Sequence, residues 1–164
     1  MIPGMSTLTF VHVMLSLIGI FAGLVVVYGL LVSKWLAGWN RLFLITTALT
    51  SITGFFFPFH KLLPSHVLGI ISLIALALAF PALYVYRLAG SWRRIYVITA
   101  VTALYLNVFV LIAQFFGKVP ALKALAPTQK EPPFLVSQLS VMVVFLAIGT
   151  LAAKRFQGDS VRTT

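Results

Sequence analysis

The chain has 164 residues, of which 61% are hydrophobic and 9% are charged. So few charges cannot cover the surface of an ordinary soluble domain, and the composition therefore indicates an integral membrane protein with one membrane domain over residues 1–164. The formal net charge is +10. The Lys and Arg residues fall between apolar runs rather than on one basic face, which argues against nucleic acid as a partner. The lack of cysteine excludes disulfides, thiol catalysis and thiolate-bound metal clusters.

Five apolar runs approach or exceed the roughly 20 residues that cross a bilayer as a helix. They cover residues 8–32, 42–57, 65–86, 95–116 and 134–153. The first run is longer than the apolar part of a signal peptide and follows no basic segment, so we expect it to be a retained span. The second is the weakest, being short and rich in Thr and Ser, whose hydroxyls can bond back to their own helix. The pattern predicts an all-α polytopic membrane protein, a bundle of five transmembrane helices.

The distribution of cations predicts how this bundle is oriented. Five spans place the two ends of the chain on opposite sides of the membrane. One side would carry eight cations, Lys34, Arg41, Arg87, Arg93, Arg94, Lys154, Arg155 and Arg162, and the other would carry four, Lys61, Lys118, Lys123 and Lys130. The positive-inside rule then predicts an outer N-terminus and a cytoplasmic C-terminus. The composition is that of a small bacterial inner-membrane protein.

All three histidines fall on the predicted outer side. His12 is near the outer end of the first span, and His60 and His66 flank the connection between the second and third spans. Gln114 and Gln138 lie near the outer ends of the fourth and fifth spans. We therefore expect a polar site at the outer leaflet.

Two kinds of ligand suit these side chains. Imidazoles on facing helices can bind haem b axially, with His12 and His66 as the pair, while His and Gln can bond the carbonyl oxygens of a quinone. The candidate cofactor-binding residues are His12, His66, Gln114 and Gln138. A zinc or copper site built from His12, His60 and His66 is the variant with a metal. The simpler alternative for each residue is a structural hydrogen bond to a neighbouring helix.

Small residues on the first span predict close helix packing. His12, Ser16, Gly19 and Gly23 recur at helical spacing on one face, and GIFAG, residues 19–23, has the G-x-x-x-G spacing that lets helices approach each other. In the longest connection, residues 117–133, four prolines predict a stiff cover. Within it the stretch PALKALA is able to form one or two helical turns.

Three classes of function remain open. The first is an accessory or cofactor-binding membrane protein, and the second is a structural or assembly subunit whose partners are the lipid bilayer and other membrane subunits or copies of itself. The third, a small-solute transporter or channel, is the least favoured, because no span contains a charged residue and no inverted repeat is seen. Catalysis is disfavoured too, since the two acids, Glu131 and Asp159, fall on opposite sides and no paired carboxylate exists, so no catalytic residue is assigned.

Overall fold

The computed structural model describes residues 7–57 and 64–156. Of these residues 85% are helical, and none of them lies in a strand, which confirms the all-α prediction. The helices are α1 (Thr7–Leu31), α2 (Ala37–Gly54), α3 (Pro64–Tyr84), α4 (Ser91–Lys118), α5 (Pro120–Leu125) and α6 (Pro132–Arg155). The short helix α5 confirms the helical turns expected in PALKALA.

Four helices of the described part are long and apolar enough to cross a membrane. They are α1, α4, α6 and the portion His66–Tyr84 of α3. Helix α2 is not among them, because its 18 residues include Asn40 and Arg41 as well as several hydroxyl side chains. It begins five residues before the predicted run 42–57 and ends three residues before the end of that run. The protein is therefore helical with four candidate membrane spans, and the predicted fifth span is not confirmed.

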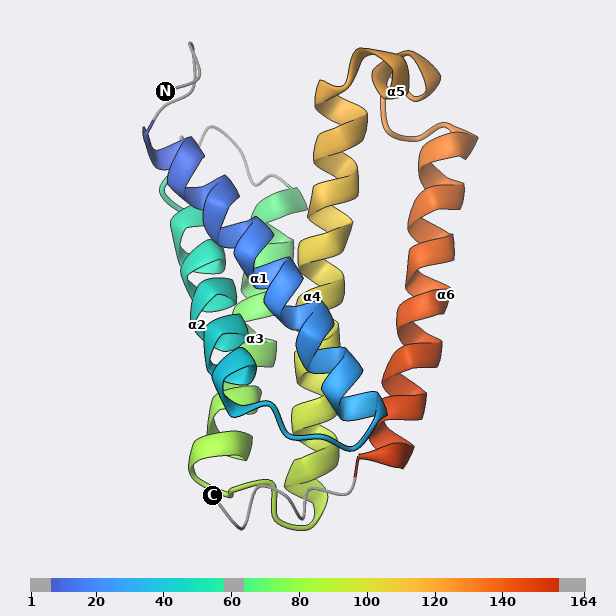
Figure 1. The fold of residues 1–164 in the computed structure, drawn as a ribbon. Coiled ribbons are helices and arrows are strands. Elements are labelled where there is room, and N and C mark those ends of the chain that lie inside the picture. The colour runs from blue at the N-terminus through green and yellow to red at the C-terminus, as the bar shows by residue number, and fades with distance from the viewer. Residues whose placement is uncertain (1–6, 58–63, 157–164) are drawn as a thin grey trace.

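The long helices lie side by side, and α1 crosses the others at an angle (Figure 1). Helix α1 packs on α2, α3 packs on α4, and α4 also packs on α6. Helix α4 is the centre of the bundle. Half of the residues in its most apolar stretch of 18 are buried, whereas 11% are buried in the corresponding stretch of α6. Helix α1 begins at one end of the bundle and α6 ends at the other (Figure 1).

Glycines on α1 let α2 and α4 come close, as the spacing of GIFAG predicts. A Cβ atom added to Gly19 would lie 3.1 Å from Thr46 Oγ1 on α2. One added to Gly23 would lie 2.6 Å from Leu104 Cδ1 on α4 and 2.8 Å from Phe43 Cε2 on α2. The predicted packing seam is confirmed, and it is the point where three helices meet.

Helix α2 turns its polar face toward the other helices. Its buried polar side chains are Asn40, Thr46, Thr47, Thr50 and Ser51. The Thr46 hydroxyl donates to the Leu42 carbonyl oxygen at 2.7 Å, so much of this polarity is satisfied within the helix itself. The exposed residues of α2 include Ile45, Leu49 and Ile52. Helix α2 is too polar to be a candidate span, but it buries its polar side chains in the bundle and exposes aliphatic ones.

Three contacts tie this polar face to its neighbours. The Asn107 amide on α4 donates to Thr47 Oγ1 at 3.4 Å. The hydroxyl oxygens of Ser51 and Ser72, on α2 and α3, lie 3.1 Å apart. Near the other end, the Tyr96 hydroxyl donates to Asn40 Oδ1, and both side chains are buried. These hydrogen bonds fix the relative positions of the helices, which apolar contacts alone would specify less precisely.

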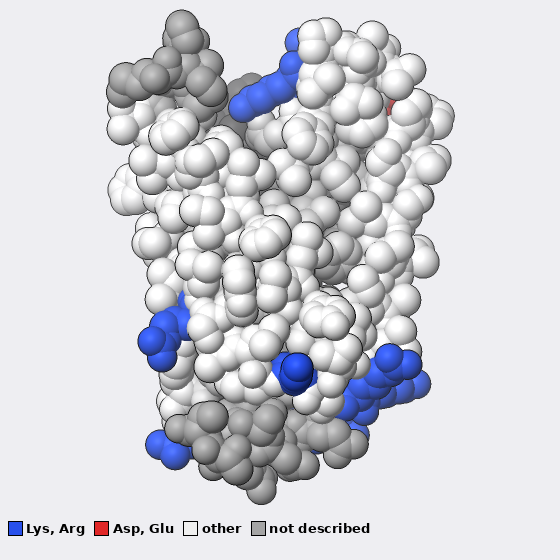
Figure 2. All heavy atoms as spheres, in the orientation of Figure 1, with Lys and Arg blue, Asp and Glu red and all other residues white. Residues whose placement is uncertain are grey.

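Lys and Arg side chains gather at the end of the molecule where α6 ends (Figure 2). Lys154 and Arg155 form the last turn of α6, and Arg93 and Arg94 lie in the first turns of α4. The apolar surface between the two ends carries almost no charge on the face shown (Figure 2). This is the pattern expected of helices that traverse a hydrocarbon layer.

Candidate functional site

His12 lies on α1 against the last turn of α2. Its Nδ1 atom is 2.9 Å from Thr53 Oγ1. The Phe57 ring, just beyond the end of α2, contacts the imidazole edge-on, with 5.2 Å between ring centroids and an angle of 86° between the ring planes. The backbone of α2 comes close to the ring at Gly54, where an added Cβ atom would be in ordinary contact with His12 Cε1 at 3.6 Å. The imidazole is half-buried and held on two sides.

The contact with Thr53 bears on which nitrogen of His12 carries the proton. The Thr53 hydroxyl has one hydrogen, and its shortest bond, 2.7 Å, runs to the carbonyl oxygen of Leu49 on its own helix. When that bond is made, the same oxygen acts as an acceptor toward the imidazole, which fits the tautomer with the proton on Nδ1 of His12. In the neutral ring this leaves the lone pair on Nε2. Nε2 is thus prepared to bind a metal ion or to accept a hydrogen bond.

His66 is in the first turn of α3, which packs near the same end of α2. Its side chain is buried, with 4% of its surface exposed. The Phe55 ring, directly after α2, lies 5.9 Å from the imidazole between ring centroids. Gly69, one turn further along α3, makes room for Phe55, since a Cβ atom there would be 3.3 Å from Phe55 Cζ. The end of α2 and the residues that follow it therefore contact both imidazoles.

Of the two glutamines of the predicted site, Gln138 packs on a different pair of helices from the histidines. Gln138 is buried between α6 and α4, where its Nε2 donates to the Phe109 carbonyl oxygen at 3.1 Å. Its Oε1 is buried with no hydrogen-bond partner among the described residues. Gln114 is exposed near the end of α4. At this end of the bundle the beginnings of α1 and α6 are well separated (Figure 1), so the structure brings His12 and His66 to α2 and leaves Gln138 on another seam.

His60 lies outside the described residues, and so the metal site that includes it stays a prediction. Within residues 7–57 and 64–156, no three His, Asp or Glu side chains are grouped closely enough to hold a metal ion.

The cover formed by α5 and the turn after it is ordered by Glu131. Its carboxylate accepts hydrogen bonds from the Thr128 hydroxyl at 2.7 Å and from the Lys130 N–H at 3.0 Å. The Thr128 hydroxyl bond is the main reason that the pKa of the Glu131 carboxyl lies below its ordinary value. Gln129 in the same turn donates to the Ala113 carbonyl oxygen at 2.8 Å, which ties the cover to α4.

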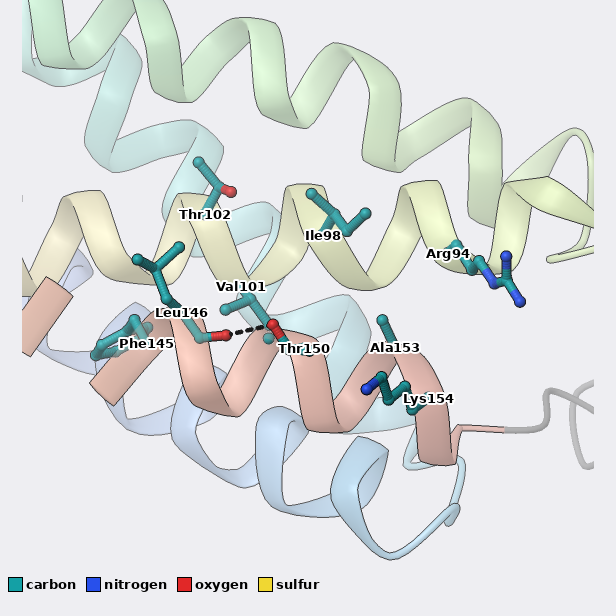
Figure 3. Close-up of a pocket in the computed structure, with 10 residues that line it drawn as sticks. Arg94, Ile98, Val101, Thr102, Phe145, Leu146, Thr150, Ala153 and Lys154 are labelled. Atoms are coloured by element: carbon teal, nitrogen blue, oxygen red, sulfur yellow. Dashed lines mark hydrogen bonds between the residues drawn. The ribbon is translucent and has the colours of Figure 1, made fainter. Parts of the chain in front are cut away.

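A groove that sequence reasoning missed lies between α4 and α6 (Figure 3). Its volume is about 550 Å³, and Arg94 and Lys154 lie at one end of it. The residues that line it come from positions 94–102 and 145–154. Helical spacing within each segment could have suggested two apolar faces, but nothing in the sequence indicates that these faces meet.

Comparison with protein-family models, with curated proteins and with solved structures finds no match to this chain. Its chemistry must therefore be argued from the contacts above. The most specific of them is the hydrogen bond between His12 Nδ1 and Thr53 Oγ1.

Proposed function

We propose that this small integral membrane protein binds haem b or a quinone cofactor at the end of the bundle where α2 ends. The observation that carries the proposal is the pairing of His12 with Thr53. A histidine that ligates a metal usually donates its other ring N–H to a fixed acceptor, which orients the ring and makes the ligating nitrogen more basic. His12 donates from Nδ1 to Thr53 Oγ1 and leaves Nε2 for the ligand.

The nature of the ligand follows from that tautomer. Nε2 is an electron-pair donor, so it can bind haem iron directly or accept a hydrogen bond from the hydroxyl of a quinol. It cannot donate to a quinone carbonyl while Nδ1 holds the proton. His66, which packs on Phe55 at the same helix end, is the candidate second axial ligand, and Phe55 and Phe57 supply aromatic surface for a flat ring. Gln114 and Gln138 stay candidates for a quinone ring.

Titration of the purified protein with haemin, and separately with a short-chain quinol, tests the proposal. We expect one of the two to bind, and His12→Ala to abolish its binding. Loss of the haem absorption band in His66→Ala as well would identify paired axial ligation. Thr53→Val should weaken the same ligand by about 10- to 100-fold, the usual effect of removing a partner that orients a ligating histidine. Thr53→Ser, which keeps the hydroxyl, is the matched control. Binding that is unaffected by His12→Ala would refute the proposal.

A structural or assembly subunit of a larger membrane complex is the second candidate, and α6 is the observation that favours it. Along its 24 residues it buries Phe134, Gln138 and Ala152. Large apolar side chains, Val136, Val143 and Leu146 among them, are more than 60% exposed. These can face lipid or a partner helix, and small residues between them would allow close approach. Copurification of a defined partner after mild solubilisation, lost on substituting exposed positions of α6, would favour this role.

We further infer that α2 crosses the membrane with the other four long helices, which places the start of α1 outside and the end of α6 in the cytoplasm of a bacterial inner membrane. The support is the excess of cations at the end where α6 finishes (Figure 2) and the burial of the polar face of α2. The native chain has no cysteine, so single cysteines at the exposed positions Ala124 and Ala89 would report the orientation. An impermeant thiol reagent should label Ala124→Cys in intact cells and leave Ala89→Cys unlabelled. The reverse pattern would overturn the orientation.

A further inference from the structure

The groove between α4 and α6 has two distinct parts. Along most of its length the lining is apolar or small, with Ile98, Val101, Phe145, Leu146 and Ala153 as its apolar side chains. At one end Arg94 of α4 and Lys154 of α6 lie on facing helices (Figure 3). A volume of about 550 Å³ is within the range of small-molecule sites, which is roughly 300–1,000 Å³.

The groove is accessible from the side of the bundle. Ile98 and Leu146, which line it, are 55% and 64% exposed. Both helices are long and apolar enough to span a membrane, so this side faces hydrocarbon when the protein is in a bilayer. Gly149 forms part of the lining, where α6 lies close to α4, because a Cβ atom there would be 3.3 Å from Val101 Cγ1. A molecule that enters the groove therefore comes from the lipid phase.

The polar side chains of the lining other than the two cations are the uncharged Thr102 and Thr150. The Thr150 hydroxyl donates to the Leu146 carbonyl oxygen at 2.7 Å on its own helix, so its hydrogen is already used (Figure 3). No carboxylate lines the groove. The acidic residue in the described part of the chain is Glu131, which lies just before the first residue of α6, whereas Lys154 is in the last turn of that helix. The positive charges of Arg94 and Lys154 are therefore not neutralised by an acidic side chain of the described residues.

We propose that this groove binds one anionic phospholipid, with an acyl chain along the apolar lining and the phosphate between Arg94 and Lys154. Charge complementarity selects this occupant: a basic pocket between membrane helices near their cytoplasmic ends is a recognised site for anionic headgroups. The guanidinium of Arg94 can bond two phosphate oxygens at once, and the Lys154 ammonium adds a second charge. The site is distinct from His12 and His66, which lie at the other end of the bundle, and it does not depend on the proposed cofactor.

Native mass spectrometry of the full chain, with matched amounts of phosphatidylglycerol and phosphatidylcholine, tests the proposal. We expect wild type to prefer phosphatidylglycerol by about tenfold or more, since a cation near a lipid surface contributes roughly a fivefold gain. The variant Arg94→Gln/Lys154→Gln should lose that preference. The control Lys34→Gln/Arg155→Gln removes the same charge from exposed positions outside the groove and should retain it.

Two further measurements separate the site from simpler explanations. Ala153→Phe, which fills the apolar part of the groove, should weaken both lipids, and inorganic phosphate should not compete, because it has no acyl chain. The single variants Arg94→Gln and Lys154→Gln provide the same test if the double variant fails to fold. Equal binding of the two lipids by wild type, an unchanged preference in the groove variants, or an equal loss in the control would each overturn the proposal.

Discussion

The substitution Gly23→Ala gives the sharpest test of the packing. The added Cβ would lie 2.6 Å from Leu104 Cδ1 and 2.8 Å from Phe43 Cε2, whereas carbon atoms in contact prefer about 3.5–4.0 Å. Each neighbour would need to move by about 1 Å. Neither has room, because Leu104 and Phe43 are 0% and 1% exposed. The methyl group must therefore strain the junction of α1, α2 and α4.

The magnitude follows from two opposing effects. Overpacking a filled core typically costs about 1–3 kcal/mol, while alanine stabilises a helix interior by about 0.5–1 kcal/mol relative to glycine. We therefore expect Gly23→Ala to lower the free energy of unfolding by about 1 kcal/mol, within a range of about 0–2.5 kcal/mol. Gly19→Ala should cost less, since the nearest atom to its Cβ, Thr46 Oγ1, lies 3.1 Å away. Gly38→Ala is the matched control, because nothing lies within 4 Å of a Cβ at that position.

Unfolding of micelle-solubilised protein by a denaturing detergent, followed by circular dichroism, measures the three variants under one condition. The expected order of stability is Gly38→Ala, then Gly19→Ala, then Gly23→Ala as the least stable. A Gly23→Ala protein as stable as the Gly38→Ala control would refute the reasoning, because the close approach of the three helices would then have no energetic consequence.

Two other predictions concern polar contacts. Tyr96→Phe removes the hydroxyl that donates to Asn40 Oδ1 and leaves that buried oxygen without this donor. We therefore expect the free energy of unfolding to fall by about 1–3 kcal/mol in the same assay. Adding Asn40→Leu should partly restore it. Glu131→Gln should destabilise the α5 cover at about pH 7. Because folding lowers the pKa of this carboxyl, its contribution is present above the unfolded pKa and is lost as the pH falls through the folded pKa. The difference between wild type and variant should therefore shrink as the pH falls through the folded pKa of Glu131, as followed by hydrogen exchange of residues 120–131; a constant difference would contradict the assignment.

Helix α2 illustrates what an average hydropathy leaves out. Its hydroxyls and Asn40 lower its hydropathy below that of the other long helices, yet most of this polarity is buried and bonded. Window averages treat all faces of a helix equally, whereas the free energy of insertion depends on which face meets lipid. Its exposed side chains, in contrast, include Ile45, Leu49 and Ile52.

The amino-acid sequence by itself determined the helical class, the approximate limits of the apolar helices and the packing role of Gly19 and Gly23. The physical reason is that a chain in hydrocarbon must satisfy its backbone hydrogen bonds locally, so long apolar runs become helices whatever their neighbours are. Glycine spacing has meaning within a single helix, and it too can be recognised without a fold.

Tertiary structure alone decided which helices meet. It placed His12 on Thr53 and His66 on Phe55, at one end of α2, and it put Gln138 against α4 instead. The groove next to Arg94 and Lys154 likewise depends on α6 packing against α4. The order of helices around a bundle comes from contacts between residues far apart in the chain, and periodicity within each helix contains no information about that order.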